Sequence, residues 1–468
     1  MSPLATTTRE PDLDAVPGHL PTAFICHGCG YRLPEEEPVR LRCPMARPGD
    51  DVDHVLVRTL EPSRLPFPSR DDPNPFVRYR TLLHGYHVAR TTGSSDGDVT
   101  RLIRRLDRDV ARVEGRGFTV TPFTREEALG AALGFADLWV KDETGNVSGS
   151  HKARHLFGTL LELELAGGEQ TTSVHPLAIA SCGNAALAAA VVARAAGRRL
   201  EVFIPPDADP AIVERLGTLG AELTICPRAA GEVGDPTFHR LQAAVAAGAV
   251  AFTCQGNLNG LAVEGGETLG WEIVSDLLAR DAHLDHVVLQ VGGGALAASV
   301  IQAFGEARQL GVLRGLPAFH AVQTRGAAPL ARAYQRLAAR LAGSRDEQDL
   351  DRELAWAAAH RSQFMWPWEK VPRSVADGIL DDETYDWLAV VGGMLRSGGR
   401  PVVVGEAALG AANRLAVRHT GIDVNHTGSA GLAGAIELLR RGEIGPDDHV
   451  AVIFTGIRRR SASVGEPS

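Results

Sequence analysis

Three short segments that contain glycine hold the side chains best suited to chemistry, and each follows an apolar run and opens a helical pattern. The first segment is Ser148-Gly149-Ser150-His151-Lys152. A lysine at the start of a helix meets the positive end of the helix dipole, which favours its neutral amine. Because Schiff-base chemistry needs a neutral amine, the segment predicts a nucleophile at Lys152. The alternative is a surface lysine without a chemical role.

The other two segments have the residue types that bind ligands beyond the carboxyl ends of strands in α/β proteins. In Ala180–Asn184, small side chains allow close approach of a ligand, and Asn184 either contacts it or only caps the next helix. In Val291–Leu296, the amides of a glycine turn and a helix N-terminus form an anion cradle. The pattern G-x-G-x-x-A at Gly292–Ala297 leaves a nucleotide-binding oxidoreductase as the alternative from another class.

The elements that must position these segments are short apolar runs alternating with Ala- and Leu-rich helical patterns. The runs with the character of buried strands are Asp137–Lys141, Pro176–Ser181, Leu200–Pro205, Ala221–Cys226, Val250–Cys254, His286–Val291, Ala318–Gln323 and Val450–Gly456. This alternation predicts an α/β fold with parallel-rich sheets and helices on both faces. A helix is predicted near Asp98–Glu114, and the Ala- and Arg-rich stretch Ala327–Arg361 is predicted to be an exposed helical insertion.

The composition of the 468-residue chain is that of a globular protein, with 44% hydrophobic and 22% charged residues. The net charge of −9 argues against nucleic-acid partners, which require a basic face. No apolar run approaches the roughly 18 residues of a membrane span, and the polar start of the chain does not look like a signal peptide. Six cysteines in a chain this long do not indicate a disulfide framework. We therefore expect a cytoplasmic enzyme with a small-molecule substrate and no membrane partner.

In this order, the segments resemble the fold type II family of pyridoxal-phosphate (PLP) enzymes, which includes threonine synthase, serine/threonine dehydratase, cysteine synthase and the tryptophan synthase beta chain. The resemblance covers most of the chain from about Asn74 onward. It is carried by NPFVRYR (74–80), KDETGNVSGSHKARHLFG (141–158), IASCGNAALAAA (179–190), VEGGETLGWEI (263–273), QVGGGALAAS (290–299), SVADGI (374–379) and AVIFTG (451–456).

The resemblance implies a role for each matching residue. Lys152 would hold PLP as a Schiff base and later take the α-proton of the substrate, Asn184 would contact the ring hydroxyl oxygen, and Thr455 would face the pyridine nitrogen. The phosphate would be held by the amides of Gly292, Gly293, Gly294, Ala295 and Leu296. The substrate would be bound by Ser148, Gly149, Ser150, Ser181 and Cys182. The implied architecture is a large PLP-binding domain (74–169 and 283–468), a small mobile α/β domain (170–282) and an irregular Cys-containing N-terminal extension (1–73), assembled as a homodimer.

Departures from the threonine synthase pattern bear on the reaction. His151 replaces an aromatic residue and is a candidate acid or base, or else packs beside the cofactor. Ala262 and Glu267 stand where threonine synthases have basic residues, and an acidic Glu267 is expected to repel a phosphate-ester substrate. We therefore predict α,β-elimination, or elimination-coupled replacement, on a small polar L-amino acid. The alternatives are a threonine-synthase-like replacement on an activated homoserine or serine derivative, and a regulatory relative without turnover.

The N-terminal extension contains half of a zinc-ribbon pattern. Cys26 and Cys29 form a CxxCG knuckle, and Cys43 follows it. A structural zinc needs four nitrogen or sulfur ligands, and the sequence offers His54 or His27 as the fourth. His54 is better separated for tetrahedral closure, so the predicted set is Cys26, Cys29, Cys43 and His54. The alternative is a decayed knuckle with free thiols.

Overall fold

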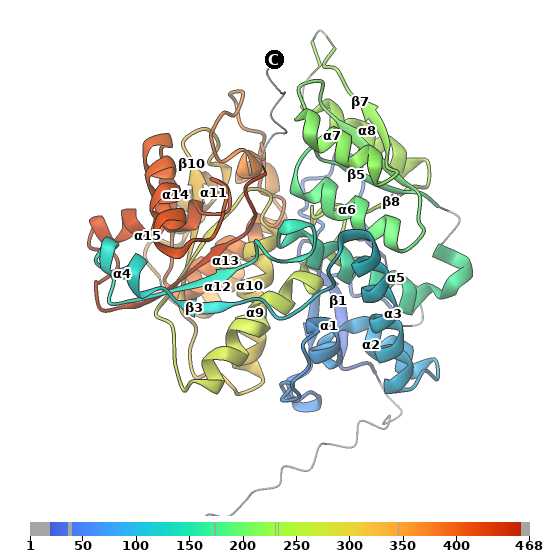
Figure 1. The fold of residues 1–468 in the computed structure, drawn as a ribbon, viewed down its shortest axis with the longest axis horizontal. Helices are drawn as coiled ribbons and strands as arrows, with labels where there is room; N and C mark the ends of the chain where they lie inside the picture. Colours follow the sequence, from blue (N-terminus) through green and yellow to red (C-terminus); the bar gives the residue numbers. More distant parts are fainter. Residues whose placement is uncertain are drawn as a thin grey trace, which may run out of the picture.

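The larger of the two parallel-rich sheets has six strands, in the spatial order β11-β10-β9-β12-β4-β3 of the computed structural model (Figure 1). The strands are β3 (Phe123–Arg125), β4 (Asp137–Asp142), β9 (His286–Gln290), β10 (Ala318–Thr324), β11 (Pro401–Val404) and β12 (His449–Phe454). Neighbouring strands are parallel, except that β3 runs antiparallel to β4. The carboxyl ends of β4, β9 and β12 therefore meet at one edge, where the first and third glycine segments follow β4 and β9.

A smaller sheet of four parallel strands, in the order β7-β6-β5-β8, carries the second glycine segment. Its strands are β5 (Leu177–Ala180), β6 (Leu200–Ile204), β7 (Glu222–Ile225) and β8 (Val250–Ala251). The helices α6 (Asn184–Ala195), α7 (Pro210–Thr218) and α8 (Pro236–Ala246) pack around it. The α/β architecture expected from the sequence is confirmed, whereas the expected domain boundaries stay a prediction.

Helices cover both faces of the larger sheet because alternate strand residues point to opposite sides. Val287 and Leu289 of β9 pack in the core beneath α9 and α10, and Val288 packs in the core beneath α15. The helices are α4 (Glu127–Leu133), α9 (Ala262–Ala279), α10 (Ala295–Gln309), α11 (Pro329–Leu341), α12 (Glu347–Ala358), α13 (Trp387–Ser397), α14 (Glu406–Thr420) and α15 (Ala430–Arg440). The stretch expected to be an exposed insertion forms α11 and α12, but Leu337 and Leu354 on their inner faces are buried, so that exposure was predicted wrongly.

Two strands and four helices from the first part of the chain lie beside the two sheets, at the lower right of Figure 1. They are β1 (Thr22–Cys26), β2 (Leu56–Leu60), α1 (Pro75–Arg78), α2 (His84–Thr91), α3 (Asp96–Glu114) and α5 (Lys152–Thr172). The strands β1 and β2 form an antiparallel pair, and α3 confirms the helix predicted there. The structure describes residues 19–35, 40–172, 175–229, 231–232, 234–344 and 346–459. The start of the chain, weighed above as a signal peptide, lies outside this range.

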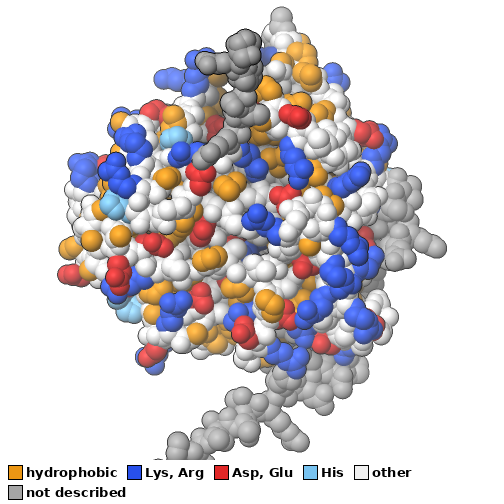
Figure 2. Space-filling view, viewed as in Figure 1, with side chains coloured by type: hydrophobic (Ala, Val, Ile, Leu, Met, Phe, Trp, Pro, Cys, Tyr) orange, Lys and Arg blue, Asp and Glu red, His pale blue; other side chains and the backbone are white. Residues whose placement is uncertain are grey.

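The surface around α2 and α3 is rich in charge. Figure 2 shows lysine and arginine side chains gathered toward the side of the molecule where these helices lie in Figure 1. Arginines of α3 form ion pairs with aspartates, namely Arg101 with Asp98, Arg104 with Asp72 and Arg112 with Asp109. The gathering is therefore a salt-bridged surface rather than a bare basic face. Within the described part of the chain, no helix combines the length and the apolar character that crossing a bilayer requires.

Candidate active site

The chain has three lysines, and the structure gives them different environments. Lys141 is fully buried, and its ammonium donates to Glu272 (2.5 Å) and to the carbonyl of Thr121 (2.7 Å). Lys370 is exposed. Lys152 begins α5 and is half-buried, and its amine makes no hydrogen bond or ion pair with any described residue. Lys152 is therefore the lysine whose amine is available for chemistry.

The turn that leads into α5 is fixed against the end of β12. The His151 amide donates to the carbonyl of Thr455 (3.2 Å), and Ser150 forms an antiparallel bridge with Gly456. Asn184, the first residue of α6, reaches the same strand end, since a Cβ on Gly456 would lie 2.8 Å from the Asn184 Nδ2 atom. A glycine at this position therefore lets the lysine turn and the asparagine converge from two sheets.

The Thr455 hydroxyl is oriented by a buried glutamine on the neighbouring strand. The Gln290 Nε2 atom donates to the carbonyls of Gly428 (2.9 Å) and Ile453 (3.2 Å) and to Thr455 Oγ1 (2.6 Å). Because carbonyls only accept hydrogen bonds, the nitrogen of Gln290, not its oxygen, must point toward Thr455. The Thr455 oxygen accepts from Gln290, so its proton is free to be donated to an unprotonated ring nitrogen.

Two hydroxyls in the lysine turn are buried without a partner. Ser148 and Ser150 are 3% and 0% exposed, and neither Oγ atom has a hydrogen-bond partner among the described residues. Ser148 also has a φ of 55°, in the left-handed region that residues with a side chain rarely adopt. An unsatisfied buried polar group costs about 1–3 kcal/mol. The strain and the unpaired hydroxyls together are typical of a turn that binds a ligand.

The glycine turn after β9 lies directly against the carboxyl group of Asp381 in this structure. Gly294 has a φ of 106°, and α10 begins at the next residue, so the turn amides lie at a helix N-terminus. A Cβ on Gly292 would lie 2.3 Å from Asp381 Oδ2, so this carboxyl group packs directly against the glycine turn. Burial raises the pKa of Asp381 to about 6, although Lys152 and the Gly293 amide favour its ionised form. The five predicted phosphate amides are those of Gly292, Gly293, Gly294, Ala295 and Leu296, the last two being the first residues of α10.

Carboxylates also surround the second glycine segment. Ser181 Oγ accepts a hydrogen bond from the amide two residues further along (3.4 Å). Cys182 is partly buried, and burial together with the charges of Asp207, Asp377 and Asp235 raises the pKa of its thiol. The three carboxylates therefore disfavour the thiolate form of Cys182.

His151 is buried, and its Nδ1 atom lies 3.3 Å from the carbonyl of Thr455. Burial, followed by the nearby Lys152 charge, holds the pKa of His151 well below its usual range. The imidazole is therefore neutral at neutral pH, which suits packing or proton acceptance better than proton donation. A catalytic role for His151 stays a prediction.

Glu267 does not have the role expected from the sequence. Its side chain is fully buried in α9 and forms an ion pair with Arg58 of β2, which also pairs with Glu306 (2.6 Å). The opposing charge comes from Arg58 in the N-terminal extension, which also faces Glu264. A fully buried carboxyl group paired in this way is not presented to a substrate, so the expected repulsion of a phosphate ester by Glu267 was wrong.

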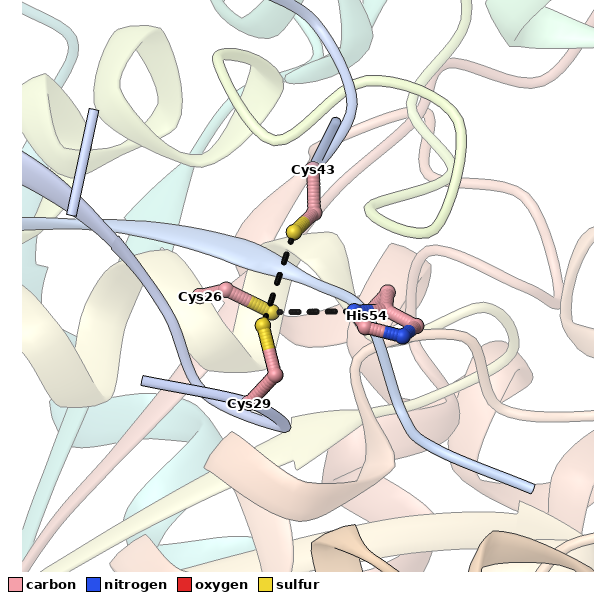
Figure 3. A group of neighbouring side chains, drawn as sticks. All are labelled: Cys26, Cys29, Cys43 and His54. Carbon is pink, nitrogen blue, oxygen red and sulfur yellow. Dashed lines mark hydrogen bonds between the residues drawn. The ribbon is translucent and has the colours of Figure 1, made fainter. Parts of the chain in front are cut away.

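Four side chains of the N-terminal extension converge as Figure 3 shows. The ligand atoms of Cys26, Cys29, Cys43 and His54 all lie within 4.8 Å of one another. Cys29 Sγ is 3.6 Å from Cys43 Sγ, and Cys26 Sγ is 3.5 Å from His54 Nδ1. Tetrahedral zinc with bonds of 2.0–2.3 Å separates its ligands by roughly 3.3–3.8 Å. The spacing of the four atoms therefore suits a zinc ion.

Three polar residues near the site were not predicted from the sequence, and a fourth lies just after the last strand. Gln290 ends an otherwise apolar strand, and that contrast could have marked it. Asp381 and Asp386 follow the SVADGI segment, and Asp386 is 3% exposed with its pKa raised to about 8 by burial. Arg459 follows the last strand and contacts both Ser148 and Asn184.

Comparisons with known proteins agree with this geometry. The model of the family described as "Pyridoxal-phosphate dependent enzyme" matches residues 116–456. The chain is 25% identical to a threonine synthase of Methanosarcina acetivorans over 337 residues, which covers 72% of this chain and 74% of the relative. It is 30% identical to an L-serine dehydratase of Saccharomyces cerevisiae over 171 residues, or 35% of this chain and 50% of the relative.

Solved structures share the fold. A maize serine racemase superposes with a TM-score of 0.55 and 18% identity, covering 76% of this chain and 94% of the racemase. A fungal L-serine ammonia-lyase from Rhizomucor miehei has a TM-score of 0.54 and 20% identity, covering 73% of this chain and 94% of the lyase. The chain belongs to the family of pyridoxal-phosphate-dependent enzymes.

The residues present fit PLP. The free amine of Lys152 suits a Schiff base, and the Thr455 proton suits a ring nitrogen. The glycine turn stands at the N-terminus of α10, where backbone amides suit a phosphate group. The choice left open by this turn, between PLP and a dinucleotide, is therefore answered by PLP.

Proposed function

We propose that this PLP-dependent enzyme catalyses α,β-elimination on a small polar L-amino acid, as an ammonia-lyase or dehydratase does. The observation that favours this chemistry over transamination is the Gln290–Thr455 hydrogen bond (2.6 Å), which leaves the hydroxyl proton of Thr455 available for the ring nitrogen of PLP. A hydroxyl does not enforce a protonated ring as a carboxylate would. The electron sink is then weaker, which favours prompt loss of a β-substituent over transamination.

Each residue of the site has a separate role in this proposed reaction. When bound, PLP draws electrons from the substrate's Cα. Lys152 is placed to take the proton from Cα, because its amine has no competing partner among the described residues. Asn184 and Thr455 would hold the ring of PLP, and the glycine turn would hold its phosphate. The hydroxyls of Ser148 and Ser150, buried and unpaired, are available to bind polar groups of the substrate.

The charges around the site support a substrate without a phosphate group. Asp207, Asp235 and Asp377 lie near Cys182, and Asp381 lies near Lys152. Like charges at short range disfavour one another, and burial strengthens the effect.

The alternative is a threonine-synthase-like replacement on an activated homoserine or serine derivative. The Methanosarcina acetivorans relative favours it, because it spans more of this chain than the serine dehydratase does. The Thr455-Gly456 pair that follows β12 is compatible with both elimination and replacement.

The test is an absorbance titration of the holoenzyme with L-serine, L-threonine, L-homoserine and O-phospho-L-homoserine, combined with product analysis. The proposal expects a spectral change with L-serine or L-threonine and release of one 2-keto acid and one ammonia per turnover. A response to O-phospho-L-homoserine with release of phosphate and formation of threonine would support the alternative and overturn elimination. Lack of a response to all four amino acids would count against both.

We also propose a structural zinc ion at Cys26, Cys29, Cys43 and His54, supported by the spacing of the four ligand atoms. Metal analysis of the purified chain should find about one zinc per chain, and Cys43→Ala should lose it while Cys226→Ala keeps it. Equal zinc content in both variants would refute this site.

The cytoplasmic homodimer is a further proposal that rests on the resemblance alone. Light scattering of the purified holoenzyme should give twice the mass of one chain, 49.7 kDa. A monomeric mass would refute it.

A further inference from the structure

Three strands of the larger sheet begin at the edge that lies opposite the lysine turn. In the order β9-β12-β4 they are neighbours, with His449 opposite Asp137 and Val450 opposite His286. His449 therefore lies between Asp137 and the residues that precede β9. Because β12 has six residues and a strand rises about 3.3 Å per residue, Thr455 lies about 20 Å from His449. This amino edge of the sheet is separate from the active site.

Two exposed side chains lie beside His449 at this edge. Leu284 is buried in the core, whereas His283 and Asp285 on either side of it are exposed. The ring centroids of His283 and His449 are 4.4 Å apart, and His283 Nε2 is 3.8 Å from Asp285 Oδ1. One ligand atom from each of His283, Asp285 and His449 lies within 4.8 Å of the other two. A movement of about 1 Å by the exposed side chains brings all three within bonding distance of one zinc ion.

A carboxylate behind His449 fixes the ring nitrogen that is left for a metal. The His449 Nδ1 atom donates to Asp137 Oδ2 (2.5 Å), and Arg125 pairs with Asp137 Oδ1 (2.6 Å). The other ring nitrogen, Nε2, then has the free lone pair. Metal-binding histidines are commonly oriented by a carboxylate in this way. His449 is therefore held in the tautomer that a metal ligand requires.

Asp285 is held through one oxygen, which leaves the other available. Its Oδ2 atom accepts from the His449 amide (2.9 Å), and its own amide donates to the His449 carbonyl (2.9 Å). The Asp285 Oδ1 atom makes no hydrogen bond with a described residue, and neither does the His283 ring. Two imidazoles and one carboxylate oxygen thus meet without competing partners in the part of the chain that the structure describes.

The neighbouring His286 shows the ordinary alternative, a histidine whose two ring nitrogens are both used inside the protein. Its Nε2 atom lies 3.1 Å from Asp448 Oδ2, and its Nδ1 atom lies 3.1 Å from His320 Nε2. His286 therefore has no nitrogen left for a metal, although it directly follows Asp285. The contrast shows that availability at His283 and His449 does not come simply from their place at the edge of the sheet.

We propose that His283, Asp285 and His449 bind a zinc ion, with Asp137 orienting His449 and water completing the coordination. Two imidazoles and one carboxylate suit zinc, whereas magnesium and calcium prefer sets made of oxygen alone. Without a thiolate, this site should bind zinc more weakly than the cysteine set at Cys26. Because it connects the starts of β9 and β12, bound zinc should stabilise the fold. The proposal is independent of the reaction that the enzyme catalyses.

The experiment measures zinc binding to the holoenzyme by equilibrium dialysis against Zn²⁺, followed by metal analysis. The variants are His283→Ala, Asp137→Asn and the matched control His239→Ala, which removes another exposed histidine that faces a carboxylate. Since the His283 side chain is 71% exposed, its removal should leave the fold intact. All variants keep the cysteine set, so zinc bound there is the same in each of them. Thermal unfolding is followed with and without Zn²⁺.

The parent should bind one more zinc ion per chain than His283→Ala does. Loss of this ligand should raise the dissociation constant of that zinc ion by at least about tenfold to a hundredfold, and Asp137→Asn should raise it about tenfold with all three ligands present. His239→Ala should bind zinc as the parent does. Added Zn²⁺ should raise the midpoint of thermal unfolding of the parent and of His239→Ala more than that of His283→Ala.

Equal zinc binding by the parent and by His283→Ala would overturn the proposal. An equal loss in His239→Ala and His283→Ala would overturn it too, because it would show zinc bound indiscriminately by exposed histidines. Zinc binding by Asp137→Asn that matches the parent would refute the orienting role of Asp137.

Discussion

Asp381 should weaken the binding of PLP, because its carboxyl group lies against Gly292 in the turn that would hold the phosphate. We expect Asp381→Asn to bind PLP more tightly than the parent. Two unit charges about 4 Å apart interact by about 4 kcal/mol at an effective dielectric of about 20, which is an upper bound for a site that solvent and movement can relax. About one third of that bound, or about 1.4 kcal/mol, corresponds to a tenfold change in affinity.

The effect should depend on pH in a direction that the structure defines. Burial raises the pKa of Asp381 to about 6, so the carboxyl group is mostly neutral at pH 5 and almost fully ionised at pH 8. The repulsion is therefore absent at pH 5 and grows as the pH rises through 6. The phosphate of PLP also titrates near pH 6, so the ratio of variant to parent is the quantity to compare.

The assay is a titration of the apoenzyme with PLP, followed by absorbance or fluorescence at pH 5, 6, 7 and 8. Asp381→Asn should bind at least about tenfold more tightly than the parent at pH 8 and about equally at pH 5. Asp382→Asn, which removes the same charge one residue further along, should change the affinity much less. Equal affinities of parent and Asp381→Asn at pH 8, or a ratio that does not vary with pH, would refute the reasoning.

Two further predictions concern buried polar contacts. Gln290→Met should leave the Thr455 hydroxyl without the side chain that orients it. Loss of a hydrogen bond of about 1–1.5 kcal/mol should lower kcat about tenfold, which steady-state kinetics measures, while the absorbance of the enzyme shows that PLP remains bound. An unchanged kcat would contradict that role. Glu272→Gln should destabilise the fold by about 3–5 kcal/mol, because it leaves the buried Lys141 ammonium without its carboxylate partner and Arg154 with Glu143 alone, whereas the exposed ion pair of Glu437 should cost under about 1 kcal/mol in Glu437→Gln. Urea unfolding measures both, and equal effects would contradict the account.

The parts of the site that the sequence could predict are those determined by neighbouring residues. Lys152 follows a strand and a glycine turn within a few residues, and Gly292–Gly294 directly follow β9. In a parallel sheet the carboxyl ends of strands share an edge, so such local patterns suffice to bring these groups together. The strand–helix alternation predicted the fold for the same reason.

The parts that the sequence could not predict depend on contacts between distant segments. Arg58 lies 209 residues before Glu267, and no local pattern indicates that the two form a buried pair. The contact of Asp381 with the glycine turn likewise depends on how the long segment between α12 and α13 folds back over the turn, which no local pattern indicates. The direction of the Gln290 amide became clear only when its three acceptors were in place.

The central claim, PLP bound covalently to Lys152, is tested most directly by an absorbance spectrum of the purified enzyme together with borohydride reduction and peptide mapping. The parent and the control Lys370→Ala should show a visible cofactor band, and the reduced cofactor should be found on the peptide that contains Lys152. Lys152→Ala should lose both the band and the label. A band that persists in Lys152→Ala, or a label on another residue of the parent, would contradict the account.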